Sequence, residues 1–146
     1  PHRQEDVQAL QYSRVLVVED DVVNQKIAMR LLEKLHCQVD VAANGCEALD
    51  AVAHMAYDCI FMDCQMPELD GFEVTKALRQ REAQTGAHVP IIALTANAMR
   101  GDSERCLEAG MDEYISKPVR SETLRAMLLK WVQPPAVSRP QAESTL

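Results

Sequence analysis

The stretch CIFMDCQMPELDG, residues 59–71, begins as an apolar run and ends in a turn. Its opening letters, CIFMD, have the length and character of a buried strand that ends in the carboxylate of Asp63. Pro67 and Gly71 give the loop its turns, and Asp70 is placed to cap the next helix. A carboxylate at the rim of an apolar core is costly unless it has partners, so the fold must supply contacts for Asp63.

Short apolar runs alternate with segments of helical period along most of the chain. We expect strands at residues 14–20, 38–42, 57–63, 89–96 and 113–118. The segments between them carry apolar residues three and four positions apart. In the first such segment, one face is expected to carry Val23, Ile27, Leu31 and Leu35, with Ala28 and Leu32 beside it. The alternation predicts a doubly wound, five-stranded parallel sheet of the α/β class, covered by helices on both faces.

Length and composition fit one globular domain. The chain has 146 residues, of which 47% are apolar and 25% charged. We expect residues 1–13 to be a linker, residues 14–133 the folded domain, and residues 134–146 a disordered tail, because both ends are polar or rich in Pro and Ser. The start at Pro1 rather than Met is consistent with a piece of a longer protein.

Charge and cysteine content narrow the classes of partner. The formal net charge of −7 argues against a nucleic-acid partner, because phosphate binding is driven by clustered Lys and Arg. No apolar run is long enough to span a bilayer, so we expect a cytoplasmic domain without direct membrane contact. The five cysteines form no metal-binding spacing and fit a reducing compartment. Cys64, directly after Asp63, either packs in the core or has a redox role.

Polar side chains follow four of the predicted strands. They are Glu19, Asp20 and Asp21 after the first strand, Asp63 after the third, Thr95 after the fourth and Lys117 after the fifth. Ligands of open parallel sheets bind at the carboxyl ends of the strands, so these groups should converge. Neighbouring carboxylates repel one another unless a cation joins them, and Mg²⁺ prefers such oxygen ligands together with phosphate. The set predicts a site that receives a phosphoryl group on a carboxylate.

The motifs VLVVEDD, FMDCQMPELDG, ALTANA and YISKP resemble, in this order, those of the receiver domains of two-component signalling. The resemblance covers residues 14–132 and implies a flavodoxin-like fold with strand order 2-1-3-4-5. It also implies that Asp63 is the phosphoacceptor and that Asp20 binds Mg²⁺ directly. Glu19 would hold the ion through water, and the backbone carbonyl of Gln65 would complete the protein ligands.

The same resemblance assigns the groups that surround the phosphoryl oxygens. Lys117 would neutralise their charge and Thr95 would hydrogen-bond to them. Tyr114 matches an aromatic switch position that turns inward when Thr95 moves, and the peptide bond from Lys117 to Pro118 is expected to be cis. Asp21 is expected to cap the first helix rather than to bind the ion.

Three functions are weighed from these motifs. The first is a signalling module with self-phosphorylation and self-dephosphorylation chemistry, which takes a phosphoryl group from a histidine kinase domain or a histidine phosphotransfer domain. It would be a monomer or weak homodimer, either free-standing or part of a hybrid sensor histidine kinase that is membrane-bound and carries the kinase activity. The second is a phosphatase of the haloacid dehalogenase type, whose D-x-D-x-T pattern is poorly met by EDDVV at residues 19–23. The third is a receiver-like adaptor that no longer accepts phosphate, although no key residue is missing.

Overall fold

Strands and helices alternate along the chain in the computed structural model, which describes residues 13–64, 66, 70–96 and 103–132. The strands are β1 (Arg14–Val18), β2 (Gln38–Ala42), β3 (Cys59–Asp63), β4 (Ile91–Thr95) and β5 (Glu113–Ser116). The helices are α2 (Val22–Lys34), α3 (Gly45–His54), α4 (Gly71–Thr85), α5 (Ser103–Ala109) and α6 (Ser121–Trp131). None of the helices described is both long and apolar enough to cross a lipid bilayer.

All five strands pair in parallel in one sheet, in the order β2-β1-β3-β4-β5. This confirms the predicted α/β fold and its strand order. The strands are shorter than the apolar runs suggest, since β1 ends at Val18 and leaves the acidic residues beyond it. Ser13, placed in the linker by the sequence, is buried, and its carbonyl accepts the N–H of Gln38.

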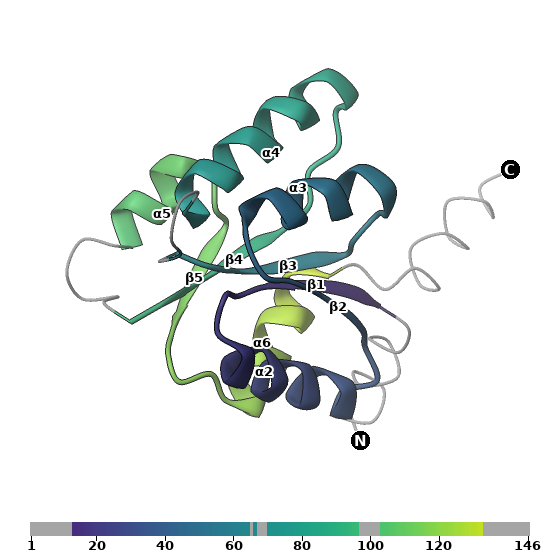
Figure 1. Cartoon of the computed structure of the whole chain (residues 1–146), viewed down its shortest axis with the longest axis vertical. Coiled ribbons are helices and arrows are strands. Elements are labelled where there is room, and N and C mark those ends of the chain that lie inside the picture. The colour runs from purple at the N-terminus through teal and green to yellow at the C-terminus, as the bar shows by residue number, and fades with distance from the viewer. Residues whose placement is uncertain (1–12, 65, 67–69, 97–102, 133–146) are drawn as a thin grey trace, which may run out of the picture.

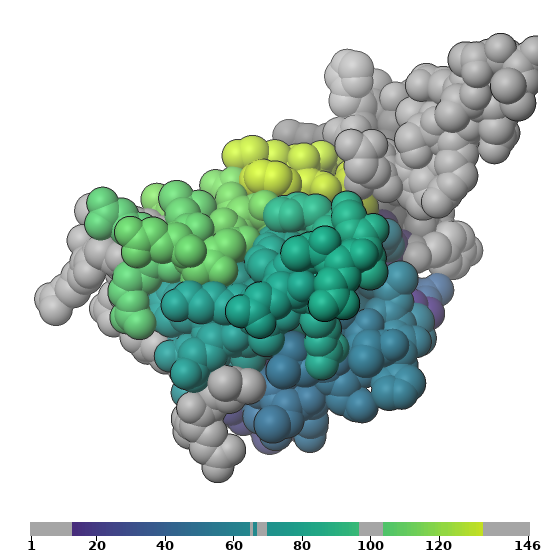
Figure 2. Space-filling view, turned by 90° about the horizontal axis from the view of Figure 1, so that it is seen from above, coloured from purple at the N-terminus to yellow at the C-terminus, as the bar shows by residue number. Residues whose placement is uncertain are grey.

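The sheet separates two apolar layers, because successive side chains of a strand point to opposite faces. Helices α3, α4 and α5 cover one face, and α2 and α6 cover the other (Figure 1). Leu16, Ile60 and Met62 belong to the first layer, while Val17 and Phe61 belong to the second. Figure 2 shows the outer surface of the first layer, where α4 lies between α3 and α5. β3 and β4 are therefore fully buried, as is β1 after Arg14, and the packing fixes the positions of their carboxyl ends.

The apolar face of α2 differs from the one predicted. Ala28, Leu32 and Leu35 are buried, but Val23 and Ile27 are 63% and 46% exposed. A helix turns by about 100° per residue, so Ala28, Leu32 and Leu35 share a narrow arc, while Ile27 and Val23 lie about 100° or more from it. The prediction that Val23 and Ile27 line the buried face is wrong, because the face of α2 that packs against the sheet is the one that carries Ala28 and Leu32.

Two carboxylates begin helices as the sequence predicts. Asp21 precedes α2 and accepts the N–H groups of Val23 and Asn24 at 2.8 and 3.2 Å. Asp70 precedes α4 and accepts the N–H of Glu73 at 3.0 Å in a capping box. Each cap satisfies N–H groups that the first helical turn leaves without partners. The carboxylate of Asp21 therefore caps α2, although it lies at the same sheet edge as the other acidic residues.

An arginine in α4 fastens the opposite, amino edge of the sheet. Arg79 donates to the carbonyls of Gly110 and Val89, both at 2.8 Å, and pairs with the carboxylates of Glu82 at 2.6 Å and Asp112 at 2.8 Å. Both carboxylates are mostly buried. Asp112 in turn accepts the N–H of Ile91 at the start of β4. The guanidinium thus joins α4 to the segments that lead into β4 and β5.

Replacing Arg79 with Met should lower the free energy of unfolding by about 3 kcal/mol, because it removes the guanidinium that pairs with two mostly buried carboxylates. The measurement is urea unfolding followed by circular dichroism. Arg81→Met is the matched control, since this exposed guanidinium on the same helix donates to the carbonyl of Leu49. It should change stability by no more than about 0.5 kcal/mol. Equal losses in the two variants would contradict the role given to Arg79.

Candidate functional site

The strand order brings Glu19 and Asp63 together. β1 and β3 are neighbours at the centre of the sheet, and Val18 pairs with Met62 in their register. Glu19 follows Val18 and Asp63 follows Met62. Both carboxylates therefore lie at the same edge of the sheet. Connections leave β1 and β3 toward opposite sides of the sheet, which is where open α/β sheets form their binding crevice.

Strands β4 and β5 add the remaining polar groups to this edge. Asp63 of β3 pairs with the residue that precedes Thr95 in β4, and Thr95 pairs with Ser116 in β5. Lys117 follows directly, and its N–H donates to the carbonyl of Thr95 at 2.9 Å. The peptide bond between Lys117 and Pro118 is cis, as the resemblance implies.

The side chain of Lys117 lies between two buried carboxylates. Its Nζ is 3.2 Å from Oδ1 of Asp63 and 3.3 Å from Oε1 of Glu19. Burial opposes the charge of this ammonium, but the two carboxylates outweigh burial and raise the pKa of Lys117. The lysine is therefore a fixed positive charge directed at Asp63.

An acidic cluster is formed by Glu19, Asp20 and Asp63. One carboxylate oxygen of each lies within 4.8 Å of the others, and Asp20 is exposed while the other two are buried. Three carboxylates around one exposed opening match the oxygen ligands that Mg²⁺ and Ca²⁺ prefer. The residues present therefore fit a divalent cation that enters from solvent on the side of Asp20.

The cluster holds a proton as well as charge. Burial raises the pKa of Glu19 to about 7, and a hydrogen bond to Asp63 and the like charge of that residue add to the effect. Lys117 and the N–H of Asp21, which donates to Glu19 Oε2 at 3.3 Å, act in the opposite direction. A cation bound by Glu19 would compete with this proton.

Two predicted switch residues occupy different environments. Thr95 is buried at the end of β4, one residue beyond the partner of Asp63. Tyr114 lies in β5, where its side chain is 37% exposed. Gln65, the predicted carbonyl ligand, lies outside the described residues.

Two contacts of the site were not predicted from the sequence. The side chain of Gln25, in α2, donates to the backbone carbonyl of Glu19 at 2.6 Å and holds the turn after β1. A Cβ on Gly71 would lie 2.3 Å from the backbone oxygen of Asp63, so only glycine fits there. The contact of Gln25 could have been suspected from the sequence, because Gln25 is a polar residue one helical turn after the capping Asp21.

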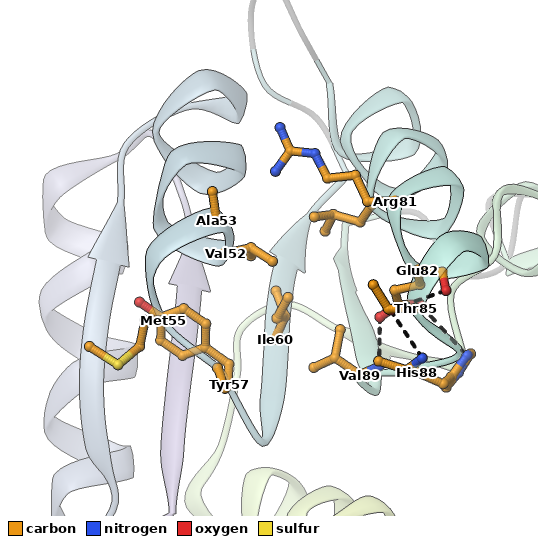
Figure 3. A pocket seen from close by; sticks show the side chains of 13 residues that line it. Val52, Ala53, Met55, Tyr57, Ile60, Arg81, Glu82, Thr85, His88 and Val89 are labelled. Atoms are coloured by element: carbon orange, nitrogen blue, oxygen red, sulfur yellow. Dashed lines mark hydrogen bonds and ion pairs between the residues drawn. The ribbon is translucent and has the colours of Figure 1, made fainter.

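The cavity beside the acidic cluster is small. It measures about 60 Å³ and includes Glu19 and Lys117 in its lining. A larger hollow of about 360 Å³ lies between α3 and α4 at the amino end of the strands, where Val52, Ile60 and Val89 make it mostly apolar (Figure 3). Sites for drug-sized ligands begin at about 300 Å³. The smaller cavity, which Glu19 and Lys117 line, lies well below that size.

Comparison with protein families agrees with this geometry. The model of the response regulator receiver domain matches residues 15–129. The chain belongs to this family. It is 43% identical over 129 residues to "Hybrid signal transduction histidine kinase I" of Dictyostelium discoideum, a match that covers 82% of this chain and 7% of that relative. The receiver chain thus spans a small fraction of the length of this relative.

Solved receiver domains have the same fold. One is the receiver domain of a sensor histidine kinase from Pseudomonas aeruginosa PAO1, with magnesium coordinated in its active site cleft. Its TM-score is 0.75 at 42% identity, over 82% of this chain and 97% of that one. The second, from Saccharomyces cerevisiae, is the receiver domain of a response regulator in complex with a histidine phosphotransfer protein. Its TM-score is 0.82 at 34% identity, over 89% of this chain and 95% of that one.

The raised pKa of Glu19 sets the pH dependence of stability without metal. The unfolded state releases this proton near pH 4.5 and the folded state near pH 7, so folding loses stability as the pH rises across that interval. Glu19→Gln should therefore unfold with roughly 1–3 kcal/mol more free energy than wild type at pH 8 in EDTA, with a smaller difference at pH 4.5. Urea unfolding at both pH values measures this. The exposed Glu33→Gln is the control, and a pH-independent difference for Glu19→Gln would refute the assignment.

Gly71→Ala should disturb the site through the backbone of Asp63. The added Cβ meets the carbonyl oxygen of Asp63, which must shift, and overpacking of this kind costs about 1–3 kcal/mol. Gly86→Ala is the control, because its backbone is left-handed (φ 79°) and space around it is open. Both variants should lose stability, but only Gly71→Ala should weaken Mg²⁺ binding in calorimetric titration. Unchanged Mg²⁺ affinity in Gly71→Ala would contradict this role.

Proposed function

We propose that this receiver domain accepts a phosphoryl group from a phosphohistidine onto Asp63, with Mg²⁺ bound, and then changes conformation. The observation that carries the proposal is the contact of the Lys117 ammonium with the carboxylates of Asp63 and Glu19, inside an acidic cluster that fits a divalent cation. Phosphoryl transfer needs positioned charges more than covalent chemistry from the protein, and this edge provides them.

Asp63 is the nucleophile in this proposal. A carboxylate oxygen of Asp63 forms a bond to phosphorus as the bond from phosphorus to the donor nitrogen breaks, and the histidine leaves with the electron pair of that bond. The Mg²⁺ would be held by Asp20 directly, by Glu19 through water and by the carbonyl of Gln65. When bound, the ion neutralises charge on the phosphoryl oxygens.

Lys117 and Thr95 complete the surroundings of the transferred group. The ammonium of Lys117 already lies 3.2 Å from Asp63, so a phosphoryl group on that carboxylate would remain within its reach. The hydroxyl of Thr95, at the end of the next strand, would donate to a phosphoryl oxygen. Each group acts where negative charge develops, which is how preorganised donors accelerate such reactions.

The conformational change would use Thr95 and Tyr114. Tyr114 is exposed on β5, next to the strand that carries Thr95, and would turn inward when Thr95 moves toward the phosphoryl group. A phosphoryl group shifts the balance between two conformations only if its contacts differ between them. Thr95 would supply that difference.

The partners in this proposal are a histidine kinase domain and a histidine phosphotransfer domain. Support comes from the yeast receiver that was solved with a histidine phosphotransfer protein and from the hybrid kinase of Dictyostelium discoideum. We infer a receiver within a hybrid sensor histidine kinase, located in the cytoplasm. A free-standing receiver is the alternative, and in both cases the domain would be a monomer or weak homodimer.

The site disfavours the phosphatase of the haloacid dehalogenase type. The nucleophile of that class follows the first strand, where this chain has Glu19. That carboxylate is buried, hydrogen-bonded to Asp63 and in contact with Lys117. Its raised pKa leaves it partly protonated near neutral pH, which makes it a weak nucleophile.

Incubation with Mg²⁺ and acetyl phosphate should add one phosphoryl group to the wild-type domain. The adduct should be labile to hydroxylamine, as an acyl phosphate is, and EDTA should prevent its formation. Asp63→Asn should remove the adduct, because an amide lacks the nucleophilic charge. Intact-protein mass spectrometry measures the adduct, and the exposed Asp50→Asn on α3 is the matched control.

The same assay separates the alternatives. Equal labelling of wild type and Asp63→Asn, or no labelling of wild type, would end the proposal. Release of many phosphates per protein with the label mapped to residues 19–21 would indicate a phosphatase instead.

A further inference from the structure

Two buried thiols touch beside the phosphoacceptor. The Sγ atoms of Cys64 and Cys106 lie 3.5 Å apart, although the residues are 42 positions apart in the chain. Their residues are 1% and 0% exposed. Cys64 comes directly after Asp63, at the end of β3, and Cys106 belongs to α5. Both are reduced in this structure.

The other cysteines, all within the described part of the chain, are placed differently. Cys46 is exposed at the start of α3. Cys37 and Cys59 lie in the opposite apolar layer, and burial raises the pKa of both thiols, to about 11 for Cys37. Cys64 and Cys106 are thus the pair whose sulfur atoms the fold holds in contact.

The separation of these sulfur atoms is close to what a disulfide needs. Closing from 3.5 Å to the bond length of about 2 Å requires an approach of about 1.5 Å. A peroxide can supply the oxidation: it converts one thiol to a sulfenic acid and water, and the second thiol then displaces water from that sulfur. The balance is two thiols and one hydrogen peroxide giving one disulfide and two water molecules.

Access to the pair depends on α5. This helix has seven residues, which is too short for a helix to be stable by itself, so it is held by the packing of its buried side chains. Short elements of this kind open locally at lower free energy than the central strands do. A small oxidant such as hydrogen peroxide can reach the thiols in such openings, while larger disulfide reagents are excluded.

A disulfide here would act on the residue next to Asp63. The N–H of Cys64 donates to the carbonyl of Leu94 at 3.1 Å, and its carbonyl accepts the N–H of Gly71 at 3.4 Å. Arg105, the neighbour of Cys106, already lies over the ring of Phe72 at 4.2 Å from its centroid. A covalent link between Cys64 and α5 would pull on this turn and displace the carboxylate of Asp63 from Lys117.

We propose that Cys64 and Cys106 form a peroxide-sensitive thiol and disulfide site that slows phosphoryl transfer to Asp63 when oxidised. The regulatory part rests on the proposed function of Asp63, whereas formation of the disulfide does not. A transient disulfide is also the form of oxidation that fits the reducing compartment inferred from the cysteine content.

The test uses the full 146-residue chain with Cys46→Ser, which removes the exposed thiol. The protein is treated with hydrogen peroxide, its remaining thiols are blocked with N-ethylmaleimide, and the disulfide is mapped by peptide mass spectrometry. We expect a bond between Cys64 and Cys106. The initial rate of labelling by acetyl phosphate and Mg²⁺ should then fall on the order of tenfold and recover with dithiothreitol, because small displacements of a reacting group have such effects.

Two further variants serve as controls. Cys106→Ala should form no disulfide at Cys64 and keep its labelling rate after peroxide, while Cys37→Ala should behave as the Cys46→Ser parent does. If Cys106→Ala does not fold, the labelling rate of the oxidised Cys46→Ser parent is compared before and after reduction with dithiothreitol.

The possible results separate this proposal from the proposed function. Absence of the bond between Cys64 and Cys106, or pairing of Cys64 with another cysteine, overturns the site. A mapped disulfide with an unchanged labelling rate overturns its control of Asp63. If the reduced protein is not labelled at all, the function of Asp63 fails and the control fails with it, while the mapped bond stands as chemistry of the two thiols.

Discussion

Electrostatic repulsion among buried carboxylates is the constraint on which this domain depends. The sheet directs Glu19 and Asp63 to one edge and holds both out of water, where burial and the charge of Asp63 raise the pKa of Glu19. Lys117 offsets part of this repulsion from the far side of the edge. A single ammonium does not balance three acidic side chains, so the cluster fits a divalent cation at this edge of the sheet. The repulsion between Glu19 and Asp63 lowers the free energy of unfolding, a cost that is typical of functional sites.

The sequence predicts the framework of the site because strand ends are local features. Asp63 follows an apolar run that is short enough to be a strand and too short for a helix. Thr95 and Lys117 likewise follow the apolar runs of later strands. The parallel sheet then brings them to one edge. Asp21 and Asp70 are likewise predictable as helix caps, since capping depends on residues within one turn.

Features that depend on three-dimensional contacts are less visible in the sequence. The exposure of Val23 and Ile27 follows from the rotation of α2 about its axis, which is set by Ala28 and Leu32 against the sheet. The approach of Gly71 to the carbonyl of Asp63 arises from the path of the chain, so the sequence alone does not distinguish this glycine from an ordinary turn residue. Distances between side chains, such as that between Cys64 and Cys106, have no local signature at all.

The Arg79 network gives the domain unequal ends. At the amino edge, one guanidinium ties α4 to the lead-in segments of β4 and β5 with charged hydrogen bonds. At the carboxyl edge, Glu19 and Asp63 repel each other and share the single ammonium of Lys117. The amino edge is therefore held by charged hydrogen bonds, and we expect a change in charge at Asp63 to move residues of the carboxyl edge while the amino edge keeps its register.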